Sequence, residues 1–216
     1  MNTPFRAVIW DFGGVITSSP FDAFNRHEAE RGLPHNAIRG INARDPDTNA
    51  WARLERDELD AAGFDAAFAE EAAALGLNIR GAEVLALLSG DIRPRMVAAL
   101  DTLKANGFAL GCITNNARVG EGPGMSSDAK KSAAVGAIMT RFDHVIESSK
   151  AGVRKPDPRI YQMMLTALDL EAADCVYLDD LGINCKPAAG LGMTAIKVTG
   201  ETQALAELSA LVGLGL

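Results

Sequence analysis

The sequence has few of the features that mark secreted, membrane-spanning or metal-thiolate proteins. Only three of its 216 residues are cysteines, Cys112, Cys175 and Cys185, and their number and spacing fit neither a disulfide framework nor a metal or redox motif. We expect them to be reduced packing residues. No apolar run approaches the roughly 18 residues of a membrane span, and the N-terminal segment has neither the basic nor the apolar part of a signal peptide. These absences predict a soluble, cytoplasmic protein.

Positive charge is also scarce. The chain has 21 lysines and arginines against 28 aspartates and glutamates, a formal net charge of -7, and no run that is rich in lysine or arginine. Proteins that bind nucleic acid or anionic lipid use such runs to neutralise phosphate groups. We therefore expect neither nucleic acid nor a membrane as a partner, but a small molecule. A monomer and a homodimer are both compatible with the composition.

Short apolar runs punctuate the chain, and each ends in polar or turn residues. They lie at 7–10, 108–114, 144–148, 175–180 and 194–200. Their hydrophobicity is continuous rather than alternating, which is typical of strands that are covered on both faces, as in a parallel sheet. Helical patterns separate most of these runs, among them "RPRMVAALDTLKANG", "PDPRIYQMMLTALDL" and "INCKPAAGLGM". This alternation predicts an α/β fold with a doubly wound parallel sheet.

Two segments do not follow the alternation. Residues 17–90 contain no clear strand and consist of alanine-rich, acidic, amphipathic patterns, so we expect a small helical domain inserted into a core made of residues 1–16 and 91–216. Residues 115–136 are rich in glycine, serine and charge, and we expect a loop or irregular helix near the mouth of the site.

Polar residues stand where the predicted strands end or in the loops that follow them. They are Asp11, Thr114, Asn115, Lys155, Asp179 and Asp180. In an open parallel sheet, ligands bind outside the carboxyl ends of the strands, so these side chains are expected to converge. A carboxylate that attacks phosphorus needs its own charge and the phosphoryl charge to be neutralised by a divalent cation with oxygen ligands and by a fixed ammonium. Asp11 and Asp180 supply the carboxylates, and Lys155 supplies the ammonium.

The motifs that carry these residues are "DFGGV", "CITNN", "VRKPDP" and "VYLDDLGINCKPAAGLGM". In this order they resemble the four motifs of the haloacid dehalogenase (HAD) superfamily of phosphotransferases. Within it, nearly the whole chain resembles the phosphatases that are related to the N-terminal domain of soluble epoxide hydrolase. The resemblance implies a HAD-like, Rossmannoid core, a helical cap formed by residues 17–90, and a Mg²⁺-dependent phosphatase that acts on a sugar or lipid phosphate.

The resemblance also implies a set of metal ligands. Asp11 would be the nucleophile, which becomes an aspartyl-phosphate, and also a ligand of Mg²⁺. Gly13 would offer its backbone carbonyl to the metal. Asp180 would be the second carboxylate near the metal, with Asp179 beside it, and Asn184 would orient the water shell of the metal.

The substrate side of the site follows from the same comparison. Thr114 and Asn115 would hold the transferring phosphoryl group, and Lys155 would neutralise charge between the nucleophile and the phosphate. Gly14, with Gly13, would let the backbone come close to the metal and the substrate.

One departure from the family pattern leaves alternatives open. Most phosphatases of the superfamily have a second aspartate, a general acid, where this chain has Gly13, and losing a general acid costs about 10²- to 10⁴-fold in rate. A metal-independent 2-haloacid dehalogenase and a catalytically weak, phospho-ligand-binding protein are therefore the alternatives. The adjacent acids Asp179 and Asp180 favour the phosphatase, because a metal-free site has no use for both. Phosphonate hydrolysis, which uses a lysine of the cap, is disfavoured because residues 17–90 contain no lysine.

Overall fold

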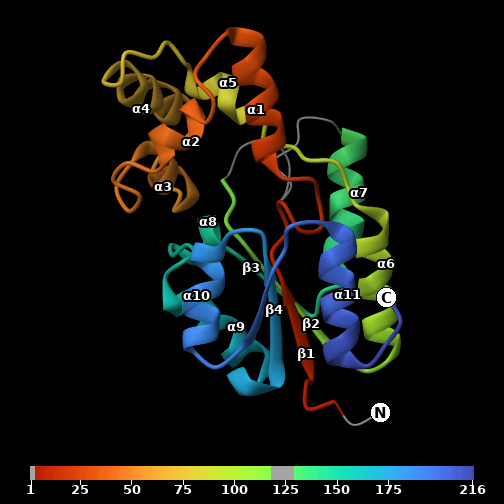
Figure 1. The fold of residues 1–216 in the computed structure, drawn as a ribbon. Helices are drawn as coiled ribbons and strands as arrows, with labels where there is room; N and C mark the ends of the chain where they lie inside the picture. The colour runs from red at the N-terminus through yellow and green to blue at the C-terminus, as the bar shows by residue number, and fades with distance from the viewer. Residues whose placement is uncertain (1–2, 118–128) are drawn as a thin grey trace.

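The centre of the molecule is a parallel sheet of five strands. The computed structural model describes residues 3–117 and 129–216. The strands run in the order β3-β2-β1-β4-β5, and all neighbours are parallel (Figure 1). Their bounds are Ala7–Trp10 for β1, Ala109–Thr114 for β2, His144–Glu147 for β3, Cys175–Asp179 for β4 and Thr194–Lys197 for β5. Each strand lies within one of the five apolar runs, so the predicted α/β fold is confirmed.

Helices cover both faces of the sheet, which explains why the strands are apolar throughout. On one face lie α6 (Pro94–Ala105), α7 (Ala129–Met139) and α11 (Glu201–Val212), and on the other α9 (Pro158–Leu168) and α10 (Gly182–Gly190), as Figure 1 shows. In β1 the side chains of Val8 and Trp10 belong to the first of these cores, and those of Ala7 and Ile9 to the second. A strand buried in this way has no polar face to display.

The order of the strands places β1 at the centre, between β2 and β4. Trp10 is in register with Cys112 of β2 and with Leu178 of β4, and the Asp11 amide continues the ladder by donating to Leu178 O at 2.8 Å. Because the strands are parallel, the residues that follow β1, β2 and β4 emerge together at one edge of the sheet. The fold therefore brings the predicted polar groups to one place.

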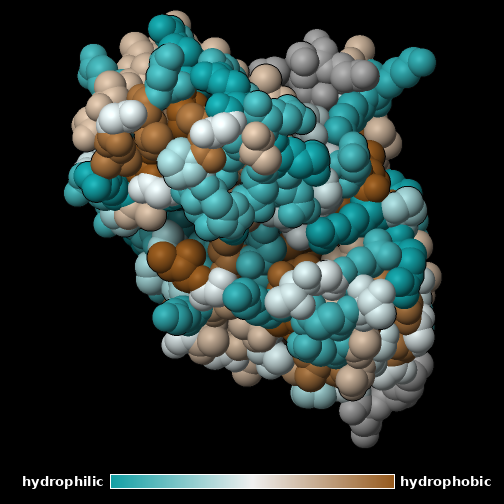
Figure 2. Space-filling view, turned by 45° about the horizontal axis from the view of Figure 1, so that its top comes forward, coloured by the Kyte–Doolittle hydropathy of each residue, from teal (hydrophilic) through white to brown (hydrophobic). Residues whose placement is uncertain are grey.

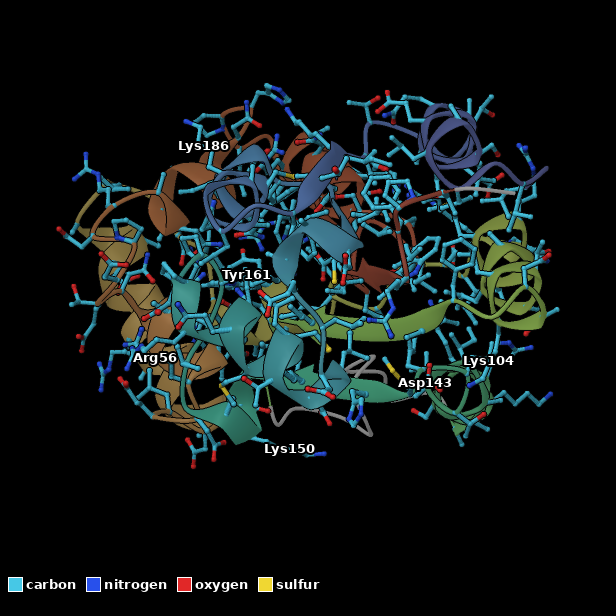
Figure 3. The ribbon with its side chains drawn as sticks, turned by 90° about the horizontal axis from the view of Figure 1, so that it is seen from below. Arg56, Lys104, Asp143, Lys150, Tyr161 and Lys186 are labelled. Atoms are coloured by element: carbon cyan, nitrogen blue, oxygen red, sulfur yellow. The ribbon has the colours of Figure 1, made fainter. Side chains whose placement is uncertain are left out.

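The opposite, amino-terminal edge of the sheet is closed by polar contacts. Lys104, near the end of α6, donates to Asp143 Oδ1 at 3.1 Å, and Asp143 Oδ2 accepts from the Leu110 amide at 2.8 Å. Seen from below in Figure 3, Lys104 and Asp143 lie next to each other at the rim, whereas Tyr161 lies inside the ribbon. The polar contacts at the amino-terminal edge link α6 to β2 and to the residue before β3. The candidate site residues lie at the carboxyl edge.

Residues 17–90 form five helices with a core of their own. They are α1 (Pro20–Arg31), α2 (Ala37–Asn42), α3 (Ala50–Glu55), α4 (Ala61–Ala73) and α5 (Gly81–Leu85). Phe24, Phe64 and Phe68 are buried at their centre, and the Trp51 ring lies edge-on to those of Phe24 and Phe64, at 6.4 and 5.8 Å between centroids. Figure 1 shows these helices above the carboxyl edge of the sheet. We call residues 17–90 the helical region.

Several smaller expectations also meet the structure. The three cysteines are free thiols, two of them buried, as predicted. Of the glycine- and serine-rich segment 115–136, residues 129–136 belong to α7, whereas 118–128 lie outside the described residues. No helix in the described part of the chain is both long and apolar enough to cross a bilayer. In Figure 2 the visible surface is largely hydrophilic, with the broadest apolar area on the helical region at the upper left.

Candidate active site

Asp11 stands directly after β1, at the carboxyl edge of the sheet. Its side chain is buried, and its Oδ1 accepts hydrogen bonds from Lys155 Nζ at 2.7 Å and from the Phe12 amide at 2.6 Å. Asp11 lies here because the four residues of β1 are apolar and buried, and Asp11 is the first polar residue after the strand. Two donors on one oxygen fix the orientation of the carboxylate. Among the described residues, none donates a hydrogen bond to Oδ2.

Lys155 is the cation of the site. Only 1% of the residue is exposed, and its ammonium contacts Asp11 Oδ1 at 2.7 Å and Asp179 Oδ2 at 2.8 Å. Burial lowers the pKa of a lysine, but the two carboxylates outweigh burial here and raise the pKa of Lys155 above its ordinary value. The side chain is therefore a permanent positive charge, aimed at the carboxylate that the sequence predicts to be the nucleophile.

Asp179 ends β4, and donors surround it. Besides Lys155, its oxygens accept from the Tyr177 hydroxyl at 2.5 Å, the Leu181 amide at 2.8 Å and the Asn184 amide group at 3.0 and 3.1 Å. The residue is fully buried. The Asn184 side chain thus bonds Asp179, which in turn bonds Lys155, and its role toward the water shell of a metal stays a prediction. Tyr177, two residues earlier on the same face of the strand, was not foreseen as part of the site.

Asp180 and the two glycines of the first motif form the other side of the site. Asp180 Oδ2 accepts from the Ser19 hydroxyl at 3.2 Å. A Cβ at Gly14 would lie 2.2 Å from this oxygen, and Gly14 has a φ of 78°, so only glycine fits here. A Cβ at Gly13 would meet no atom within 4 Å. Position 13 therefore has room for a Cβ, and steric hindrance at that atom does not explain why this chain has glycine there.

The three carboxylates are close enough to share a cation. One oxygen from each of Asp11, Asp179 and Asp180 lies within 4.8 Å of the others. Burial, and then the neighbouring carboxylates, raise the pKa of Asp11 well above its ordinary value despite the opposing effect of Lys155. Burial and the charge of Asp179 likewise raise the pKa of Asp180 to about 6. Three carboxylates that face one ammonium lack positive charge, and a hard cation with oxygen ligands fits such a place.

Thr114 and Asn115 close the site from the side of β2. Thr114 is buried at the end of its strand. The side chain of Asn115 bonds the backbone of Lys155 twice, since Nδ2 donates to Lys155 O at 3.0 Å and Oδ1 accepts from Lys155 N at 2.8 Å. The structure thus brings Asp11, Asp179, Asp180, Lys155 and Asn115 together, and it places Thr114 next to Asn115 at the end of β2. The Asn115 side chain bonds the backbone of Lys155 in this structure, and the role of Thr114 and Asn115 in holding a phosphoryl group stays a prediction.

Comparison with known proteins agrees with this geometry. The family model of the haloacid dehalogenase-like hydrolases matches residues 5–192. The chain belongs to this family. The HAD resemblance that its motifs indicate is therefore confirmed, and the matched range includes the whole acid and lysine cluster.

Some curated relatives of this HAD-like hydrolase are larger proteins, and the chain matches one part of each. Acyl-CoA dehydrogenase family member 10 of Mus musculus is 32% identical over 98% of this chain and 20% of that protein. Bifunctional epoxide hydrolase 2 of Mus musculus is 28% identical over 96% and 39% respectively. The chain thus spans far less than the full length of these two relatives. A sesquiterpene phosphatase of Aspergillus oryzae is 27% identical over 99% of this chain and its own entire length.

Solved HAD structures share the fold. An enzyme of Bacteroides thetaiotaomicron, in complex with magnesium and inorganic phosphate, has a TM-score of 0.60 and 16% identity, covering 91% of this chain and 96% of that one. The L-2-haloacid dehalogenase of Xanthobacter autotrophicus, with chloropropionic acid covalently bound, has a TM-score of 0.61 and 18% identity, covering 98% and 84%. At these identities the likeness is one of fold, and it does not choose between phosphatase and dehalogenase.

Proposed function

We propose that this HAD-like hydrolase is a Mg²⁺-dependent phosphatase, which hydrolyses a small-molecule phosphate monoester through an aspartyl-phosphate on Asp11. The observation that carries the proposal is the cluster of Asp11, Asp179 and Asp180 around the buried ammonium of Lys155. The cluster offers a nucleophile, a fixed positive charge and a surplus of carboxylate oxygens at one point. Transfer of a phosphoryl group requires all three.

In the proposed reaction, an oxygen of Asp11 attacks phosphorus, and the bond between phosphorus and the leaving oxygen breaks. The alcohol departs and takes up a proton. Water then attacks phosphorus, which releases inorganic phosphate and restores the Asp11 carboxylate. Lys155 stabilises the negative charge on both the nucleophile and the phosphoryl oxygens, and the Thr114 hydroxyl holds the phosphoryl group in line.

The carboxylates of Asp11 and Asp180, with the backbone carbonyl of Gly13, would hold the magnesium ion. Asp179 stands beside them, with its oxygens already bonded to Lys155, Tyr177 and Asn184. When bound, the ion supplies positive charge that keeps Asp11 ionised and offsets the charge of the phosphoryl group. Burial raises the pKa of Asp11, and a bound cation would oppose this effect by favouring the ionised carboxylate.

The helical region is proposed to be a cap domain, inserted into a core of residues 1–16 and 91–216. It lies over the carboxyl edge of the sheet (Figure 1), and Ser19 at its start contacts Asp180. A cap in this position would exclude water and select the substrate. The Aspergillus oryzae relative is named for a sesquiterpene substrate, which supports a lipid phosphate. A sugar phosphate is the other class that the family resemblance allows.

The three-carboxylate cluster also argues against the dehalogenase. Attack of Asp11 on a halogenated carbon needs no cation. Asp180, which accepts from the Ser19 hydroxyl and forms no ion pair with any of the described residues, would then stand beside Asp179 without a cation of its own. Burying uncompensated charge costs several kcal/mol, so a metal-free enzyme gains nothing from keeping Asp180 beside Asp179. The dehalogenase and the phospho-ligand-binding protein therefore become outcomes of the test.

The test is a panel of phosphate monoesters, assayed with Mg²⁺ and with a chelator, for the wild type and for Asp11→Asn. We expect Mg²⁺-dependent phosphate release that the variant abolishes, while its circular dichroism stays that of the wild type. Hydrolysis that continues in the variant would refute the assignment of Asp11. Chloride release from a 2-haloacid without metal would establish the dehalogenase, and binding of phosphate esters without release would establish the binding protein.

A further inference from the structure

The helical region touches the core at a residue that no family motif contains. Glu55, the last residue of α3, is only 6% exposed. Its Oε2 accepts from Arg154 Nε at 2.5 Å and from Asn115 Nδ2 at 3.3 Å. Both donors belong to the core, and both are direct sequence neighbours of predicted site residues. A carboxylate of the helical region is thus inserted into the wall of the site.

From Glu55 the contacts lead to the catalytic ammonium in a short chain. Asn115 uses the same Nδ2 to donate to Lys155 O at 3.0 Å, and its Oδ1 accepts from Lys155 N at 2.8 Å. The backbone of Lys155 is therefore held on both sides by one amide group. The side chain of Lys155 reaches from this clamp to Asp11 and Asp179, so a turn of the Asn115 amide would move the ammonium.

The backbone around Glu55 is tied to the core as well. Ser148, at the start of α8 (Ser148–Ala151), donates its hydroxyl to Glu55 O at 2.7 Å, and the Ser148 hydroxyl oxygen itself accepts from the Asn116 backbone amide at 3.0 Å. Arg154 reaches further into the helical region and donates to Pro46 O at 3.0 Å. The carboxylate is consequently held at a fixed place against the core.

A negative charge is needed at this position. Arg154 and Asn115 both donate to Glu55 Oε2, and removing the charge of this acceptor weakens both hydrogen bonds, that from the Arg154 guanidinium the more because it is charge-assisted. A single carboxylate oxygen accepts from both at once, which a neutral side chain does less strongly. The charge of Glu55 therefore fixes the Asn115 amide in the orientation that the backbone of Lys155 requires.

We propose that Glu55 is a positioning residue, which acts through Asn115 to place Lys155 between Asp11 and Asp179. In this proposal, Lys155 takes its place in the site only when the helical region is docked on the core, because Glu55 belongs to the helical region and Asn115 to the core. The kinetic part of this inference rests on the proposed phosphatase function, whereas the structural part does not.

The kinetic test is Glu55→Gln, which removes the charge and keeps the size of the side chain. Misplacing the ammonium by a fraction of an ångström to 1 Å lowers kcat by roughly 10- to 100-fold. Because Lys155 also faces the phosphoryl oxygens of the substrate in the proposed reaction, kcat/KM falls by at least the same factor. The matched control is Glu28→Gln. Glu28 is an equally buried carboxylate of the helical region, but it accepts from the amides of Asn36 and Ile38, so the control should keep the wild-type kcat.

A second measurement does not need activity. In protein labelled with ¹⁵N-lysine, hydrogen exchange of the Lys155 amide reports directly on its bond to Asn115. Glu55→Gln should speed this exchange by about tenfold or more, while the amide of Lys104 in α6 keeps its wild-type rate. Should Glu55→Gln not fold, Glu55→Asp, which shortens the reach of the carboxylate, provides the same test.

The outcomes separate the two proposals. Faster exchange at Lys155 in a protein without phosphatase activity would keep the positioning role and refute the proposed function. Unchanged exchange would overturn the positioning role, and so would a wild-type kcat in Glu55→Gln. An equal loss of kcat in Glu28→Gln would also overturn it, because any weakening of the helical region would then have the same effect.

Discussion

Replacing Asp179 by asparagine tests how much of the stability of the protein depends on the site. The carboxylate is fully buried, and its two oxygens accept hydrogen bonds from four groups: the Lys155 ammonium, the Tyr177 hydroxyl, the Leu181 backbone amide and the Asn184 side-chain amide. An asparagine amide must turn its NH₂ group toward some of these donors. The substitution thus removes a charge from a buried pair and creates donor-donor contacts in the same place.

The expected cost follows from these contacts. Removing one partner of a buried ion pair destabilises proteins by about 3–5 kcal/mol, which is a large part of the about 5–15 kcal/mol of a typical domain. For a protein of this size, about 2–4 °C of melting temperature correspond to each kcal/mol. We therefore expect Asp179→Asn to lower the Tm by roughly 6–20 °C, measured by thermal unfolding at pH 7.5 without metal.

The control is Asp101→Asn on α6. Asp101 bonds Arg141 at 2.8 Å, but 58% of the Asp101 side chain is exposed, and such surface pairs contribute at most about 1 kcal/mol. A loss of stability in Asp179→Asn no greater than in this control would refute the reasoning. It would mean that Lys155 keeps its place through Asp11 alone.

Three further predictions concern the metal and the proton. Asp180→Ala should raise the Mg²⁺ concentration needed for half-maximal activity strongly, and an unchanged requirement would remove Asp180 from the ligand set. At position 13 an added Cβ would meet no other atom within 4 Å, and Gly13→Asp should speed hydrolysis of esters with poor leaving groups, whereas an unchanged rate would show that another residue already supplies the acid. The pKa of Asp180 is raised from 3.8 to about 6 in the folded protein, so the folded state binds this proton more tightly than the unfolded state does. Between about pH 4 and 6, ionisation of Asp180 therefore lowers the free energy of unfolding as the pH rises. Because only the ionised form binds metal, the increase in Tm caused by Mg²⁺ should grow as the pH rises through about 6, and an increase of equal size at pH 5 and 7.5 would contradict this.

The sequence allowed the sheet to be predicted because burial on both faces leaves a plain signal. Strands such as β1 are apolar without interruption, and the first polar residue after each, such as Asp11, marks the carboxyl edge of the sheet. The convergence of Asp11, Lys155 and Asp180 followed from this topology and from the order of the motifs. Local pattern and parallel pairing sufficed for that step.

Other parts of the site depend on contacts that no local pattern records. Glu55 meets Asn115 and Arg154 across 60 and 99 residues of sequence, and its charge looks like any other in an acidic helix. The bond from Asn184 in the first turn of α10 to Asp179 was likewise not foreseen from the spacing of the motif. Such pairings are set by how helices dock, which three-dimensional packing alone decides.

The central claim is that Asp11 becomes phosphorylated during turnover. An acyl phosphate is reduced by borohydride to an alcohol, which converts the aspartate into homoserine. The protein should therefore be incubated with substrate and Mg²⁺, quenched in acid, reduced, digested and analysed by mass spectrometry. We predict homoserine at position 11, and none when substrate is omitted. Rapid phosphate release with an unmodified residue 11 in samples quenched throughout the reaction would contradict the account.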